Sequence, residues 1–318
     1  MHTHHRLVTA LAVLLGSAVA APAGATEFVF HNGFEFGFDV ITPDVALAAG
    51  EEALLCYYFH TPNTATLGTT RWSATMTPGS EHVILFNTYS STWTPKDQQP
   101  DGTLLKGASC NAVGLSDYVG WVFDARPDSP PFSTAADDGS GKPLALEILS
   151  GQPSLLQWYA INTGVDPLTT QVRLSAAALG PAEAYTKTAA FFALNTNISV
   201  GNGQSGVNVI QTCNTPAASF WSLSTRTHHF SPTSRIINNG GNVVVSADYA
   251  HPNEQLYFPP NFLAFTSNQM SHECTYNNPG PTQLHAGDSE FSSEVCYAIG
   301  YFFPAAHPSL CLNGLSPL

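Results

Sequence analysis

The chain has 318 residues, with 10 lysine and arginine residues against 23 aspartate and glutamate residues, and a formal net charge of −13 at pH 7. This acidic balance argues against nucleic acid and anionic membrane surfaces as partners, because both would repel the protein. The length is sufficient for two ordinary domains, each with its own core.

The N-terminal residues have the three parts of a secretory signal peptide. A start that includes the basic Arg6 precedes an apolar run over residues 7–20, and small residues follow as far as Ala25. The apolar run is shorter than the roughly 20 residues that a membrane-spanning helix needs. We therefore expect residues 1–25 to be a signal peptide that is cleaved near Ala25. The mature protein is expected to be secreted or periplasmic, without membrane insertion.

Six cysteines follow the predicted signal peptide, and none of them forms a C-x-x-C pair of the zinc or redox type. They are Cys56, Cys110, Cys213, Cys274, Cys296 and Cys311. An even number of cysteines in an exported protein predicts disulfide bonds, three in this chain. Spacing alone leaves their pairing open.

Short apolar or alternating runs recur along the mature chain and predict β-strands. Clusters of Gly, Pro, Asn, Asp and Ser separate these runs, and no segment keeps a helical period. The expected strands cover residues 28–30, 53–59, 83–87, 144–149, 154–162, 169–176, 190–194, 220–224, 242–247, 262–266 and 297–303. The predicted fold class is all-β, as an antiparallel β-sandwich or jelly roll.

A break in this pattern at residues 179–185, which read LGPAEAY, predicts a domain boundary. The expected domains are residues 26–179 and residues 186–318. Residues 107–142 are rich in Pro, Asp, Ser and Gly, and they predict a long loop within the first domain.

Six segments, taken in order, carry a resemblance to a known family. They are residues 55–59 (LCYYF), 76–86 (MTPGSEHVILF), 156–162 (LQWYAIN), 224–229 (STRTHH), 273–278 (ECTYNN) and 293–304 (SEVCYAIGYFFP). Together they resemble bacterial-type members of the copper type II ascorbate-dependent monooxygenases, the family of peptidylglycine α-hydroxylating monooxygenase and dopamine β-monooxygenase. The resemblance covers nearly the whole mature chain. It implies two tandem antiparallel β-sandwich, jelly-roll-like domains that face each other across a solvent-filled cleft, with one copper on each domain.

The same resemblance implies how the cysteines pair. Cys56–Cys110 would be the disulfide of the first domain. Cys213–Cys311 and Cys274–Cys296 would be the disulfides of the second.

The first copper of the family is held by three histidines, and this chain keeps one of them. The family's His-His pair reads Glu81-His82 here, so His82 is retained and Glu81 is a carboxylate. The third histidine lies in a Gln-x-His-Tyr-x-Asn pattern, and Tyr159 stands at its position. A phenol is a poor copper ligand, because its pKa near 10 must be overcome before the phenolate binds.

The second copper takes two histidines and a methionine, and again one ligand is kept. The His-x-His pair reads Arg226-Thr227-His228, and the guanidinium of Arg226 is a fixed cation that repels a metal ion. The methionine position, one residue before a cysteine, is Val295, which has no donor atom. Four of the six ligand positions are thus altered. Two-copper hydroxylation is expected to be disabled, with copper absent or weakly bound.

Two functions stay open. The first is a non-catalytic binding or accessory protein for a small molecule or a protein, acting through the cleft where Tyr159, Arg226 and His228 would gather. The second is a copper-dependent monooxygenase with remodelled coordination. A remodelled site would use either Glu81 with His82, or His228 with His229 and His272 as auxiliary donors, and zinc or copper would suit such ligation. Adjacent strand residues point to opposite faces, so His228 and His229 share a metal only if the backbone bends.

Overall fold

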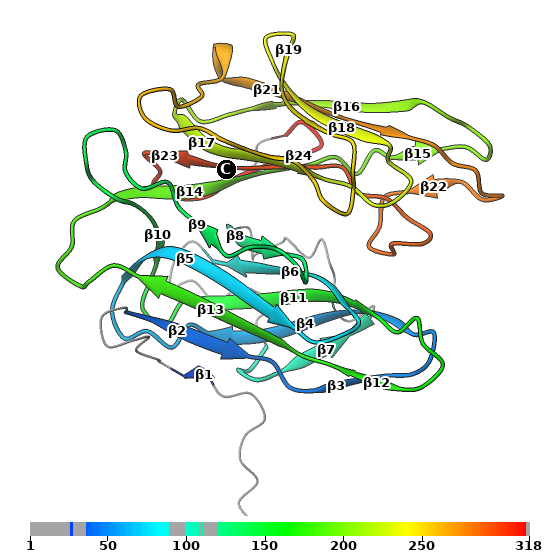
Figure 1. The fold of residues 1–318 in the computed structure, drawn as a ribbon, viewed down its shortest axis with the longest axis horizontal. Helices are drawn as coiled ribbons and strands as arrows, with labels where there is room; N and C mark the ends of the chain where they lie inside the picture. The colour runs from blue at the N-terminus through cyan, green and yellow to red at the C-terminus, as the bar shows by residue number, and fades with distance from the viewer. Residues whose placement is uncertain (1–25, 28–35, 89–98, 108–109, 111–119, 316–318) are drawn as a thin grey trace, which may run out of the picture.

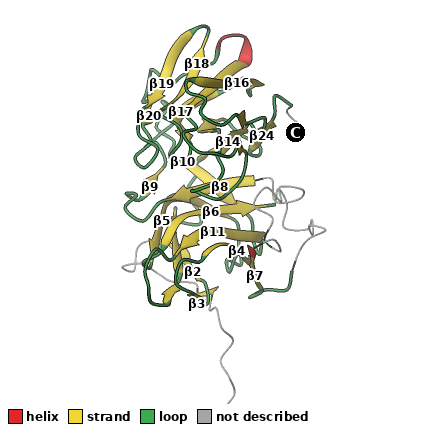
Figure 2. Cartoon of the chain, turned by 90° about the vertical axis from the view of Figure 1, so that its right-hand side faces the viewer, coloured by secondary structure: helices red, strands yellow, loops and turns green. Residues whose placement is uncertain are grey.

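The computed structural model describes residues 26–27, 36–88, 99–107, 110 and 120–315, and the structural statements below refer to these residues. The fold is all-β and sandwich-like, with several antiparallel sheets. In Figure 1 the strands up to β13 form the lower half of the molecule, and the strands from β14 onwards form the upper half. Figure 2 shows the same two halves after a quarter turn.

The first half is built from two sheets. One has the order β7 (Leu104–Lys106), β4 (Glu52–His60), β11 (Pro153–Ile161), β6 (Ser80–Asn87), β8 (Gly120–Ala125). The other begins with β1 (Thr26–Glu27), β2 (Phe36–Ile41), β13 (Val172–Ala178), β5 (Leu67–Met76) and β10 (Leu144–Ile148), and β9 (Phe132–Ser133) pairs with β5. A short ribbon joins β3 (Val45–Leu47) to β12 (Leu168–Thr170). Central β11 is buried along its whole length, in keeping with the apolar or aromatic character of most of its residues.

The second half repeats the arrangement. One layer contains β14 (Thr186–Leu194), β23 (Tyr297–Phe303), β17 (Ser219–Arg226) and β20 (Glu254–Leu256), and β24 (Ser309–Leu312) pairs with β14. The other layer has the order β16 (Val207–Asn214), β21 (Gln269–Tyr276), β18 (Thr233–Asn238), β19 (Gly241–Ser246). A ribbon pairs β15 (Ser199–Val200) with β22 (Leu284–His285), and a 3₁₀ turn, η2, covers Thr266–Asn268.

The two halves are joined by strand pairing and by aromatic packing. β10 pairs in parallel with β14, so that one sheet of eleven described strands extends through both halves. The ring centroids of Trp121 and Phe192 lie 4.4 Å apart, and those of Phe132 and Tyr301 lie 4.6 Å apart. One hydrophobic cluster therefore runs from the first half into the second. Side chains fill much of the space between the halves.

Most of the expected strands are present, and two predictions need correction. The nine runs from 53–59 to 242–247 and 297–303 coincide with described strands, although residue 171 divides the run 169–176 into β12 and β13. The prediction of a strand over residues 262–266 is wrong, because in the described chain Leu263 forms only an isolated bridge to Phe220. The prediction of a long loop over residues 107–142 is wrong in part, because this segment contains β8 and β9. The run 28–30 lies outside the described residues.

The three disulfides implied by the resemblance are all present. Cys56 is bonded to Cys110, Cys213 to Cys311, and Cys274 to Cys296. Three disulfides indicate an oxidising, extracytoplasmic environment. The predicted signal peptide lies outside the described residues, and within the described part of the chain no helix has the length and apolar character needed to cross a membrane.

Candidate functional site

A small cavity between the two halves brings together residues that the sequence assigned to separate copper sites. Its volume is about 40 Å³. Strands β6, β8 and β11 line it from the first half, and β17, the loop after β17 and β23 line it from the second. His82, Arg226, His228 and Val295 all lie in its wall, whereas Glu81 and Tyr159 do not.

His82 enters the cavity wall from β6. It lies opposite Tyr159 in the register of β6 and β11, and the two rings stack with centroids 5.8 Å apart and planes inclined by 12°. Burial, together with the nearby Arg126 and His228, lowers the pKa of His82 to about 3. The imidazole is therefore neutral at pH 7, with one nitrogen as a donor and the other as an acceptor.

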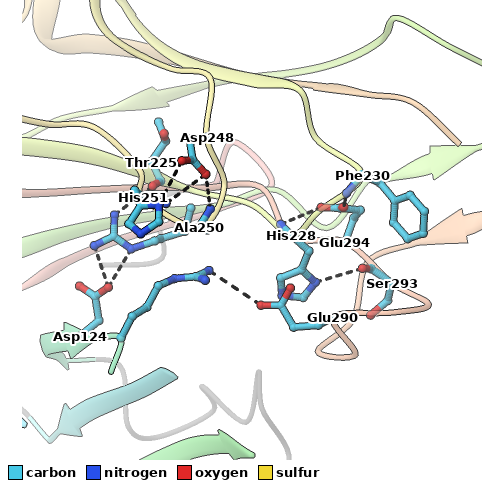
Figure 3. A network of polar contacts seen from close by, with 12 residues as sticks. Asp124, Thr225, His228, Phe230, Asp248, Ala250, His251, Glu290, Ser293 and Glu294 are labelled. Atoms are coloured by element: carbon cyan, nitrogen blue, oxygen red, sulfur yellow. Dashed lines mark hydrogen bonds and ion pairs between the residues drawn. The ribbon is translucent and has the colours of Figure 1, made fainter. Parts of the chain in front are cut away.

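His228 is held in the loop after β17 by two neighbours from residues 293–294. Its Nδ1 lies 3.0 Å from the carbonyl oxygen of Ser293, which can only accept, so Nδ1 carries the proton and Nε2 keeps its lone pair. The carboxylate of Glu294 accepts the backbone N–H of His228 at 3.0 Å and that of Phe230 at 2.7 Å, as Figure 3 shows. Burial lowers the pKa of His228 to about 4, so this imidazole is also neutral at pH 7.

Arg226 links the two halves across the cavity. Its Nε and one terminal nitrogen each lie 2.9 Å from Oδ2 of Asp124 on β8. Its other terminal nitrogen donates to Oγ of Ser224 at 2.6 Å and to the carbonyl oxygen of Thr225 at 3.0 Å. Figure 3 shows Asp124 and Thr225 on either side of this contact. Most of the guanidinium's donors are thus used within the protein.

The phenol of Tyr159 is also engaged by protein. Its hydroxyl donates to the carboxylate of Glu52, and this carboxylate accepts a second hydrogen bond, at 3.0 Å, from Oγ of Ser289 in the second half. Burial and the neighbouring Glu52 raise the pKa of Tyr159 above its usual value. Tyr159 therefore stays protonated and helps to connect the halves.

The two other altered positions differ from each other. Glu81 is partly buried outside the cavity wall, and burial raises the pKa of its carboxyl. Val295 is buried in the wall and offers only methyl groups.

The auxiliary histidines do not line the cavity with His228. His229 is exposed, and its ring lies against Phe230 with centroids 3.8 Å apart. His272 is buried on β21, opposite Gln211 of β16. Neither His229 nor His272 belongs to the cavity wall.

His272 gives a prediction about acid stability. Neither of its ring nitrogens makes a hydrogen bond of normal geometry with the described residues, and burial lowers its pKa to about 4. In the unfolded chain a histidine has a pKa of about 6.5, so as the pH falls the unfolded chain binds a proton at residue 272 before the folded chain does. The contribution of neutral His272 to the free energy of unfolding is therefore complete above pH 6.5 and is lost as the pH falls towards 4. As the pH falls from 8 to 5, the unfolding free energy of the natural chain should decrease by about 2 kcal/mol more than that of His272→Leu.

Urea unfolding at several pH values measures this difference. His285→Gln, at an exposed histidine, is the matched control and should keep the natural pH profile. Identical profiles for His272→Leu and the natural chain would show that burial does not penalise the charged ring.

The donors around the cavity do not match the two-copper ligand set. Arg226 and Val295 supply no metal ligand, and the Tyr159 hydroxyl is occupied by Glu52. Across residues 36–88, 99–107 and 120–315, no group of three or more His, Cys, Asp or Glu side chains is arranged to hold a metal ion. His82 and His228 supply the two neutral imidazoles of the cavity wall.

Several residues of the site had no part in the sequence prediction. Asp124 lies in β8, and Arg126 directly follows this strand. Both belong to the segment whose composition predicted a loop. The apolar stretch Gly-Trp-Val-Phe at the start of β8 was the available signal for a strand there. Gln157 and Asp288 also line the cavity.

Comparisons with known proteins do not assign a family. No family description matches the chain, and no curated protein matches it. The major capsid protein P2 from bacteriophage PM2 is similar with 10% identity and a TM-score of 0.33, over 81% of this chain and 97% of that chain. The cowpea mosaic virus top component is similar with 6% identity and a TM-score of 0.32, over 92% of this chain and 95% of that chain. Scores this low carry no argument about function.

Proposed function

We propose that this chain is an exported relative of the copper type II ascorbate-dependent monooxygenases that has lost two-copper hydroxylation and acts as a binding or accessory protein. Its two jelly-roll-like domains would be residues 26–179 and 186–318, facing each other across the cavity described above. The six ordered segments and the pairing of all six cysteines are consistent with this kinship.

The position of Arg226 carries the proposal. A metal ligand must offer a lone pair, and guanidinium offers none and repels cations. Arg226 is fixed by its ion pair with Asp124 at 2.9 Å, so that its charge stays beside His228 in the cavity wall. The removal of even an outer partner of a metal ligand typically costs roughly 10–100-fold in affinity or activity. The replacement of two ligands per site should cost more.

A second candidate is a copper-dependent monooxygenase with remodelled coordination, which would oxidise paired donors with O₂. One observation favours it: His82 and His228 line the same cavity, both neutral, and Nε2 of His228 has its lone pair available. Neutral imidazole suits copper.

Oxygen consumption separates the two candidates. The purified, disulfide-bonded protein would be supplemented with copper and then given ascorbate, and oxygen uptake would be followed with an electrode against copper and ascorbate alone. We expect no uptake above this background. Uptake that depends on both the protein and ascorbate, and that is lost in His82→Ala and His228→Ala, would favour the enzyme.

A further inference from the structure

Arg126 is a cavity-lining cation whose donors are largely unused. Its side chain is 18% exposed, and its ion pair with Glu290 spans 3.8 Å, which is too long for a hydrogen bond. No other side-chain partner for it is found among the described residues. Arg126 lines the same cavity as both histidines, and its charge contributes to lowering the pKa of His82 and of His228. A guanidinium has five N–H donors in a planar fork, so most of them remain free at the cavity.

Other N–H donors meet Arg126 in the cavity wall. The indole N–H of Trp121 is buried and makes no hydrogen bond of normal geometry in the described chain, although Tyr301 is close to it. Among the described residues, the side-chain amide of Gln157 donates one hydrogen bond, to Sγ of Cys56 at 3.8 Å. His82 lies in the same wall and adds a ring N–H. The wall therefore offers donors from β6, β8 and β11.

Of the two arginines in the cavity wall, Arg126 has the more distant acidic partner, Glu290 at 3.8 Å. Arg226 is neutralised by Asp124 at 2.9 Å. Burial raises the pKa of Glu81 and of Glu290, and it raises that of Asp288 to about 6, so Asp288 in the cavity wall is ionised at pH 7 and becomes neutral as the pH falls through about 6. His82 and His228 are uncharged.

The volume limits what can bind. One water needs roughly 10–15 Å³ of such space, so a cavity of about 40 Å³ holds three or four waters. A planar ion of three or four heavy atoms has a similar size. Tetrahedral sulfate and phosphate are larger.

We propose that this cavity is a binding site for a small planar oxyanion, of the size of nitrate, hydrogen carbonate or acetate, with Arg126 as its principal donor. Two oxygens of such an ion match the two parallel N–H groups of a guanidinium. The Gln157 amide, the Trp121 indole and the His82 ring supply the surrounding donors. This inference rests on the proposed binding function, and it names the ligand class of the same cavity.

Titration calorimetry with sodium nitrate and sodium acetate in chloride-free buffer tests the inference. A ligand of four heavy atoms is expected to bind no tighter than about 40 μM. Arg126→Gln should weaken both ions at least about tenfold, because a charge-assisted hydrogen bond is lost. Arg235→Gln is the matched control, since Arg235 pairs with Glu273 at 2.9 Å away from the cavity, and it should bind as the natural chain does. Sulfate should bind more weakly than nitrate.

Two results would overturn the inference: no nitrate or acetate binding to the natural chain, or equal binding by Arg126→Gln. If Arg126→Gln does not fold, the natural chain alone still tests the inference. Nitrate bound in the cavity must shift the imidazole NMR signals of His82 and His228. The copper content of the same sample distinguishes the two proposals. A chain without copper and without anion binding overturns only this inference, whereas retained copper with turnover overturns the proposed function.

Discussion

Replacement of Cys213 and Cys311 with alanine is expected to lower the free energy of unfolding by about 4.7 kcal/mol in the chain-entropy account of disulfides. This bond closes the longest loop of the three, with a sequence separation of 98 residues. Both cysteines are fully buried, in the cluster that includes Phe191 and Phe220. Loss of the bond frees the unfolded chain over most of the second half.

The bond between Cys274 and Cys296 is the matched comparison, because its separation is only 22 residues. Its removal should cost about 3.4 kcal/mol by the same account. Urea unfolding of the two double variants under non-reducing conditions measures both losses. A larger loss for the short loop than for the long one would contradict the chain-entropy explanation.

Asp124→Asn is expected to lower the free energy of unfolding by about 3 kcal/mol, because it leaves Arg226 as an unpaired charge between the halves. The side chains of Arg226 and Asp124 are only 23% and 14% exposed, so water replaces the lost partner poorly. The contact joins β17 to β8, so its loss should also loosen the packing of the two halves.

A second variant tests the cause of this loss. Asp124→Asn combined with Arg226→Met should regain much of the stability, because the removal of both charges leaves none unpaired. Glu273→Gln is the control, since its partner Arg235 is 39% exposed, and it should cost less than about 1 kcal/mol. Thermal or urea unfolding gives all three values. A double variant as unstable as Asp124→Asn would mean that the carboxylate matters for packing and not for charge.

Sequence patterns predicted strands best where a strand is central. Residues 153–161 are mostly apolar and entirely buried in β11, so their composition predicts a strand. β5 (Leu67–Met76) escaped prediction because half of its residues are polar or exposed and its place depends on pairing with the distant β13. β8 escaped because its six residues, five of them buried, stand within a segment rich in turn formers.

The site was predicted less completely than the fold. The family resemblance predicted His82 and His228 as retained ligand positions, one for each of two separate coppers. Their meeting in one cavity follows from the parallel pairing of β10 with β14 and from aromatic contacts between the halves, which no local pattern encodes. Arg126 could not be predicted for the same reason, because its importance depends on which side chains surround it.

The copper content of the natural chain tests the central claim most directly. The protein would be loaded with copper under ascorbate, dialysed, and analysed for metal, beside a variant that restores the ligands through Glu81→His, Tyr159→His, Arg226→His and Val295→Met. We predict that the natural chain retains far less than one copper per chain and that the restored variant retains more. Retention of one or more coppers per natural chain, held through His82 and His228, would contradict the claim that its ligand set no longer supports two-copper chemistry.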